Sequence, residues 1–146
     1  MCSAHATVRG LLGELLGGTG NGRDVVLDLE AGLEHLSRGT ARYASHVFVI
    51  VEPYFRSLET GRRVKELAAE LGIQHVEAIA NKIRDAEDRR SISEFCTAAG
   101  LPLAVEIAYD ATLVAAERAG AAPVDFDAAS PLVAALAQLA ARVAAA

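Results

Sequence analysis

Hydrophobic positions along this chain follow two alternating periods. Four short, nearly continuous apolar runs predict strands that are buried on both faces. These runs are DVVLDL (24–29), HVFVIVEP (46–53), HVEAIANK (75–82) and PLAVEIAYD (102–110). Around them, apolar residues recur at the three-to-four-residue spacing of amphipathic helices. This second pattern predicts helices over 3–16, 57–71, 91–100, 111–119 and 130–144.

Several helix boundaries carry recognisable signals. Glycines follow the helical patterns at positions 17, 18, 72 and 100, where a residue of positive φ can end a helix. Ser91 and Glu94 have the spacing of a capping box, which predicts a helix start at Ser91. Three segments read as connections: the Gly-rich tract 17–24, the solvated charged stretch 84–90 and the loop 119–130.

Buried strands alternating with amphipathic helices predict an α/β fold, with a mostly parallel sheet flanked by helices. In such sheets, ligands bind beyond the carboxyl ends of the strands. Most of the unusual polar residues of the chain stand at these ends. They are Asp28 to Gly32, Glu52-Pro53, Asn81-Lys82 and Tyr109-Asp110.

Two of these strand ends suggest a specific chemistry. A carboxylate at Asp28 could hold Mg²⁺ through water, and Gly32 could turn a backbone N–H toward a terminal phosphate. The alternative for Asp28 is a simple helix cap. The amide of Asn81 can donate and accept on one face, as a purine edge demands, and the stem of Lys82 can lie along a base plane. The alternative for this pair is a polar turn. Guanine is disfavoured because Asp85 stands one residue too late for the Asn-Lys-x-Asp pattern.

Composition narrows the class of partner. The 146 residues carry a net charge of −5, which argues against binding to a nucleic-acid backbone. Two cysteines, Cys2 and Cys96, do not form a disulfide framework, so a cytosolic setting is expected. No signal peptide or apolar run long enough to span a membrane is visible, and the Ala-rich tail lacks the basic face of a membrane-surface helix.

Taken in order and spacing, the strand ends resemble the later part of the MinD/ParA class of P-loop ATPases. The shared segments are D-x-x-A-G at 28–32, P-x-x-x-S at 53–57, the Asn-Lys pair at 81–82, and an ending at 107–124 that resembles the class pattern I-x-Y-D…G-x-P-V, with one further residue between its Gly and its Pro. The resemblance is sharpest to CooC-type ATPases, because DLEAGLEHLSRGTAR carries Glu30 where cell-division members usually carry Pro. It implies that residues 1–146 are one partial domain, the C-terminal portion of a P-loop NTPase fold. It also implies Asp28 and Gly32 as catalytic residues, and Asn81, Lys82, Tyr109 and Asp110 as contacts to ATP or ADP with Mg²⁺.

The same resemblance gives meaning to the opening stretch CSAHATVRGLL. CooC-type ATPases carry a Cys-x-Cys pair at the start of a helix, and Cys2 corresponds to its second cysteine. The resemblance therefore implies Cys2 as half of a Ni²⁺ or Zn²⁺ site shared across a homodimer, with carbon monoxide dehydrogenase or a similar nickel enzyme as client. The alternative is an ordinary thiol near the terminus. Met1 would then be an internal methionine, or the chain a fragment.

One motif of the class is missing. No G-x-x-x-x-G-K-[ST] phosphate loop occurs in the sequence, and GELLGGTGNGRD has no Lys after its glycines. Because such loops supply much of the electrostatic stabilisation of phosphoryl transfer, we expect no ATP hydrolysis by these 146 residues alone. Two alternatives stay open: a truncated partitioning or positioning ATPase of the MinD/ParA class, and a non-catalytic fragment that keeps the fold.

Overall fold

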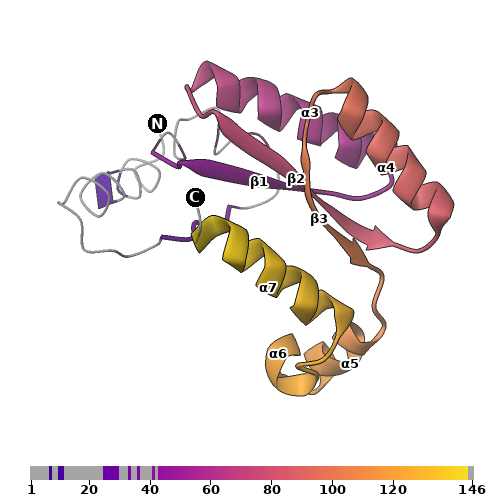
Figure 1. Cartoon of the computed structure of the whole chain (residues 1–146). Coiled ribbons are helices and arrows are strands. Elements are labelled where there is room, and N and C mark those ends of the chain that lie inside the picture. Colours follow the sequence, from indigo (N-terminus) through magenta and orange to yellow (C-terminus); the bar gives the residue numbers. More distant parts are fainter. Residues whose placement is uncertain are drawn as a thin grey trace.

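A three-stranded parallel sheet forms the centre of the fold (Figure 1). The computed structural model describes residues 7, 10, 11, 25–29, 33, 36, 41 and 43–144. The strands lie in the order in which they occur: β1 (His46–Val51), β2 (His75–Ile83) and β3 (Leu103–Ala108). β1 pairs with β2 from His46 opposite His75 to Val51 opposite Ala80. The carboxyl ends of the three strands therefore lie along one edge, as a parallel sheet requires.

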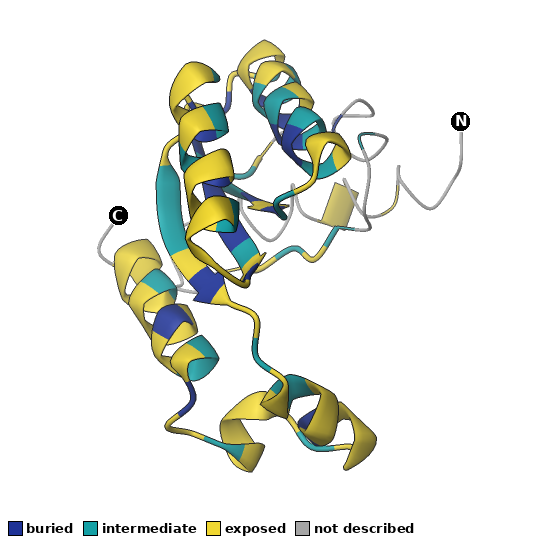
Figure 2. Ribbon diagram, turned by 90° about the vertical axis from the view of Figure 1, so that its right-hand side faces the viewer, coloured by how far each residue is buried: buried dark blue, intermediate teal, exposed yellow. Residues whose placement is uncertain are grey.

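Helices cover both faces of this sheet (Figures 1 and 2). The helices after β1 and β2 are α3 (Phe55–Glu70) and α4 (Ala86–Ala98), and those after β3 are α5 (Thr112–Arg118), α6 (Pro123–Phe126) and α7 (Pro131–Ala144). α3 and α4 pack on one face, and α7 packs on the other. This arrangement confirms the predicted α/β fold with a parallel sheet flanked by helices. Within the described part of the chain, no helix is long and apolar enough to cross a membrane.

The larger core lies between the sheet and helices α3 and α4. Its most buried side chains come from both layers: Val51, Ala68, Ala78, Ala80, Ile92, Cys96 and Leu101. α3 approaches β1 closely at Gly61, where a Cβ atom would stand 2.8 Å from Cγ1 of Val51. The smaller core, on the other face, joins Ile79 and Ile107 to Ala135 of α7. Ile50 of β1 is 60% exposed.

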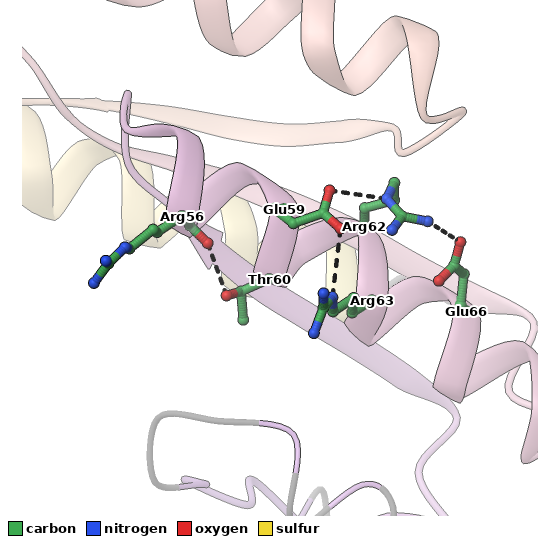
Figure 3. Close-up of polar contacts among 6 residues, drawn as sticks. All are labelled: Arg56, Glu59, Thr60, Arg62, Arg63 and Glu66. Atoms are coloured by element: carbon green, nitrogen blue, oxygen red, sulfur yellow. Dashed lines mark hydrogen bonds and ion pairs between the residues drawn. The ribbon is translucent and has the colours of Figure 1, made fainter.

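The outer face of α3 carries a chain of ion pairs (Figure 3). Arg62 pairs with Glu59 at 2.5 Å and also with Glu66, while Arg63 reaches Glu59 at 3.4 Å. The hydrogen bond from Arg62 lowers the pKa of Glu59 to about 2. Pairs three and four residues apart on a helix stabilise it modestly, and most of these side chains are well exposed, so they favour the helix rather than form a site.

The strands and helix ends follow the predictions with one clear failure among the strands. The runs 46–53, 75–82 and 102–110 are confirmed as strands, with ends shifted by one to two residues. The run 24–29 is wrong as a strand, because residues 25–29 have no regular structure and Val26 is 92% exposed. A short apolar run becomes a strand only when its backbone pairs with a neighbour, and none of the described strands pairs with it.

The start of α4 was also predicted wrongly. The helix begins at Ala86 rather than Ser91, so most of the stretch 84–90 is helical and not a loop. Asp85 is the N-cap, and its Oδ1 accepts hydrogen bonds from the backbone N–H groups of Glu87 and Asp88. The earlier cap therefore takes the place of the predicted capping box at Ser91.

The remaining helices agree more closely. The helices predicted over 57–71, 111–119 and 130–144 correspond to α3, α5 and α7, and Gly72 and Gly100 follow α3 and α4 with positive φ, as expected for their ends. The predicted loop 119–130 contains the single turn of α6. Thr7, Gly10 and Leu11 are helical, and the rest of the predicted helix 3–16 lies outside the described residues.

Candidate nucleotide site at the carboxyl edge of the sheet

A β-bulge shapes the carboxyl end of β2. Ala80 pairs with Glu106 and Ile83 pairs with Ala108, so three steps along β2 match two steps along β3. The extra residue reverses the alternation of side chains, and both Ala80 and Ile83 belong to the core beneath α3 and α4. Lys82, inside the bulge, has a φ of +57°. Such a backbone is rare for a residue with a side chain and is found where the surrounding structure holds it, often at functional sites.

An ion pair joins this bulge to the end of β1. Nζ of Lys82 lies 2.7 Å from Oε1 of Glu52, and this contact raises the pKa of Lys82. The backbone N–H of Glu52 donates to Oγ of Ser57 over 2.9 Å. Ser57, the serine of the P-x-x-x-S segment, therefore fixes the turn between β1 and α3. In this way it positions Glu52, which pairs with Lys82.

Asn81 and Lys82 thus lie at the predicted edge, among the last residues of β2. Oδ1 of Asn81 accepts a hydrogen bond from the backbone N–H of Lys82 over 3.0 Å. A carboxamide oxygen has a second lone pair, and the amide nitrogen has two hydrogens, so the side chain keeps the capacity to read a purine edge.

A second cluster at the same edge was not predicted. The guanidinium carbon of Arg84 lies 4.9 Å from the centre of the Tyr109 ring. The hydroxyl of Tyr54 also interacts with Arg84 and raises the pKa of its guanidinium. The backbone N–H of Tyr109 donates to the carbonyl oxygen of Ile83 over 2.8 Å, so the strand ends on which these residues stand are themselves tied together. Arg84 was assigned to a solvated loop. Its position three residues after Asn81, near the end of the same predicted strand, could have indicated that it belongs to the site.

Asp110 has a local structural contact. Its Oδ1 accepts hydrogen bonds from the backbone N–H and the hydroxyl of Thr112, at 2.8 and 2.6 Å. These bonds lower the pKa of Asp110, so it carries a negative charge at neutral pH. Both bonds fall on one carboxylate oxygen. Tyr109 and Asp110 follow β3 directly, as predicted.

Of the three other predicted site residues, the structure describes Asp28. Asp28 is exposed, in a segment without regular structure. Gly32 and Cys2 lie outside the described residues. Among the residues that the structure describes, no group of three or more His, Cys, Asp and Glu side chains could hold a metal ion.

Comparisons with known proteins point to one class. The carbon monoxide dehydrogenase accessory protein CooC of Rhodospirillum rubrum is 37% identical over 120 residues, which are 82% of this chain and 44% of that protein. An uncharacterized ATP-binding protein of Methanocaldococcus jannaschii is 33% identical over 128 residues, which are 87% of this chain and 48% of that protein. The chain thus spans about half the length of these curated relatives. No family model matches the sequence.

Among solved structures, the MinD cell division protein of Aquifex aeolicus superposes with a TM-score of 0.74, over 97% of this chain and 61% of that one. At 17% identity this match supports the fold only. The sequence matches show the evolutionary relationship, and they agree with the strand-end motifs found along the chain. The chain belongs to the MinD/ParA-like class of P-loop ATPases and is close to the CooC proteins.

Proposed function

We propose that the chain is the base-binding and switch portion of an ATP-dependent nickel-insertion metallochaperone of CooC type. The observation that carries the proposal is the gathering of Glu52, Asn81, Lys82 and Tyr109 along one sheet edge, in a chain 37% identical to a CooC protein. In open α/β sheets this edge is where ligands bind. That relative is named as a carbon monoxide dehydrogenase accessory protein, which suggests a nickel enzyme as the client, in the cytoplasm.

In this proposal each residue of the edge contacts a different part of the nucleotide. Asn81 reads the adenine edge, Lys82 lies beside the base plane, and Tyr109 and Asp110 border the same side. The negative charge of Asp110 would repel the phosphates, so the sugar or the base would lie on that side. The sequence has no phosphate loop, so the chain alone is expected to bind nucleotide weakly and not to hydrolyse it.

Asp28 and Gly32 are proposed to serve the phosphate end. Mg²⁺ usually takes one or two carboxylates together with water and phosphate oxygens, so a single exposed carboxylate such as Asp28 fits its needs. When bound, the ion would neutralise charge on the phosphates. Gly32 would supply a backbone N–H to the terminal phosphate.

Nickel is proposed as cargo, held at Cys2. One thiolate from each subunit of a homodimer gives two ligands, whereas a closed site for a soft metal usually needs four. The chain as printed should therefore bind Ni²⁺ or Zn²⁺ weakly. A Cys placed directly before Met1 would complete a Cys-x-Cys pair, and the dimer would then offer four thiolates.

Two titrations test the proposal. In the first, ATP and GTP are titrated against the chain and against its Asn81→Ala variant. We expect ATP to bind more tightly, and the variant to lose this preference, because the carboxamide of Asn81 is the group proposed to match the donors and acceptors of adenine. Equal affinity for both nucleotides in the unmodified chain contradicts adenine recognition.

The second titration uses Ni²⁺ and Zn²⁺ on a chain extended by one Cys before Met1, with and without Cys2→Ser. We expect about one metal per dimer, lost on the substitution. An unchanged affinity and stoichiometry in Cys2→Ser contradicts the metallochaperone assignment and favours a partitioning or positioning ATPase of the same class.

A further inference from the structure

Three side chains from three different connections meet at the carboxyl edge. Tyr54 comes from the turn after β1, Arg84 from the turn after β2, and Tyr109 from the turn after β3. The guanidinium of Arg84 lies over the ring of Tyr109, 4.9 Å from its centre, and the hydroxyl of Tyr54 interacts with the same group. The two tyrosines are each 48% exposed, and Arg84 is exposed as well.

The backbone on either side of Arg84 is firmly held. Ile83, just before it, is buried in the core, and Asp85, just after it, caps α4. The backbone N–H of Arg84 itself donates to Oδ2 of Asp88 over 2.9 Å. The backbone of Arg84 is therefore already ordered before a ligand binds. This lowers the conformational entropy that is lost when the guanidinium contacts a ligand.

The surrounding charges select the kind of ligand that Arg84 can take. Asp85, Glu87 and Asp88 follow within four residues, at the start of α4. The negative charges of these side chains repel a phosphate at this end of the edge, although a lone arginine would attract one. A planar, uncharged ring has no such conflict. Guanidinium and phenol planes are the surfaces on which nucleobases stack.

We propose that Arg84, supported by Tyr54 and Tyr109, is the stacking surface for the base of the bound nucleotide, while Asn81 reads the edge of the same base. This inference rests on the proposed nucleotide-binding function and adds a second, separable contribution to it. Stacking is tolerant of base identity, since every base has a π-face. Edge reading by a carboxamide is not, because it depends on matched donors and acceptors.

The two contributions are separated by titrating AMP and GMP against the full chain and three variants, followed by the NMR signals of the tyrosine rings. The variants are Arg84→Ala, Asn81→Ala and the control Arg90→Ala, which removes an equal charge from an exposed position on α4. We expect Arg84→Ala to weaken both nucleotides by about tenfold, the scale for loss of one stacked base. Asn81→Ala should reduce the preference for AMP over GMP, and Arg90→Ala should change neither.

Arg84→Lys guards against a loss of folding in the alanine variant. It keeps the positive charge but has no planar group, so we expect it to lose most of the affinity that Arg84→Ala loses. Affinities within twofold of the unmodified chain in Arg84→Lys or in a folded Arg84→Ala overturn the stacking role and leave the proposed function standing. Absence of any AMP binding by the unmodified chain instead overturns the proposed function, and the stacking role with it.

Discussion

The ammonium group of Lys82 lies 2.7 Å from the carboxylate of Glu52 and so joins the ends of two neighbouring strands. Lys82 can make this contact from a left-handed backbone within a β-bulge, while the bulge returns Ile83 to the core. The polar edge and the packed interior are thus set by the same extra residue.

Replacing Glu52 by Gln should lower the pKa of Lys82 toward its ordinary value of 10.5, because the hydrogen bond and the charge of Glu52 raise it. The raised pKa means that the pair stabilises the fold fully below about pH 10.5 and loses this contribution as the pH rises through the folded value. An NMR titration of the Lys82 side chain measures this pKa in the unmodified chain and in the variant. The same pKa in Glu52→Gln as in the unmodified chain would show that the pair does not form in solution.

Two substitutions at Lys82 separate its backbone from its side chain. Lys82→Gly and Lys82→Ala both remove the ion pair, but only glycine adopts a φ of +57° without steric cost. We therefore expect the melting temperature of Lys82→Gly to exceed that of Lys82→Ala by about 4 °C. The usual preference of a strand interior for alanine would give the reverse order, and that order would contradict the left-handed backbone.

Gly61→Ala should destabilise the chain despite the better helix propensity of alanine. The propensity gain is about 1 kcal/mol, whereas the new Cβ would stand 2.8 Å from Cγ1 of Val51, which is fully buried. Overpacking of this kind typically costs 1–3 kcal/mol, so we expect a net loss of about 1 kcal/mol in the free energy of unfolding. Chemical denaturation measures it.

The double variant Gly61→Ala/Val51→Ala provides the control for that prediction. Val51→Ala removes the atom that the new methyl group would meet, so the cost of Gly61→Ala should fall in this background. An equal cost of Gly61→Ala in both backgrounds would show that the close approach of α3 to β1 is not its cause.

Asp110 should titrate below its ordinary pKa of 3.8, because the hydroxyl and backbone N–H of Thr112 both donate to it. A lowered pKa stabilises the fold above about pH 3.8 and ceases to do so as the pH falls through the folded value. Thr112→Val removes the hydroxyl and should return the pKa part of the way to 3.8. Thr97→Val, which removes a hydroxyl bonded within α4, should leave the pKa unchanged. Carbon-13 NMR of the carboxyl group tests both variants.

The sequence was sufficient to predict three strands because each is apolar on both faces and is bounded by a turn residue. It failed at 24–29, where local hydrophobicity alone could not show whether a pairing partner exists. It failed at the start of α4 because Asp85 and Ser91 are both plausible caps, and the choice between them depends on where β2 ends. The bulge that sets this end is a property of pairing with β3.

The site was predictable only in outline for the same reason. Parallel strands bring Asn81, Lys82 and Tyr109 to one edge, which the order of elements already indicated. The contacts of Arg84 with Tyr54 and Tyr109 join residues 30 and 25 positions apart, and no local pattern marks them. Such contacts become visible only when the ends of all three strands are placed together.

The central claim is that a nucleotide base binds at the carboxyl edge of the sheet, and NMR mapping of the full chain with ATP tests it most directly. We expect saturable shifts at Asn81, Lys82, Arg84 and Tyr109, which share this edge. The residues around Leu101 and Leu103, near the amino end of β3, should stay unchanged. Shifts confined to that opposite end, or no saturable shifts at Asn81 and its neighbours, would contradict the claim.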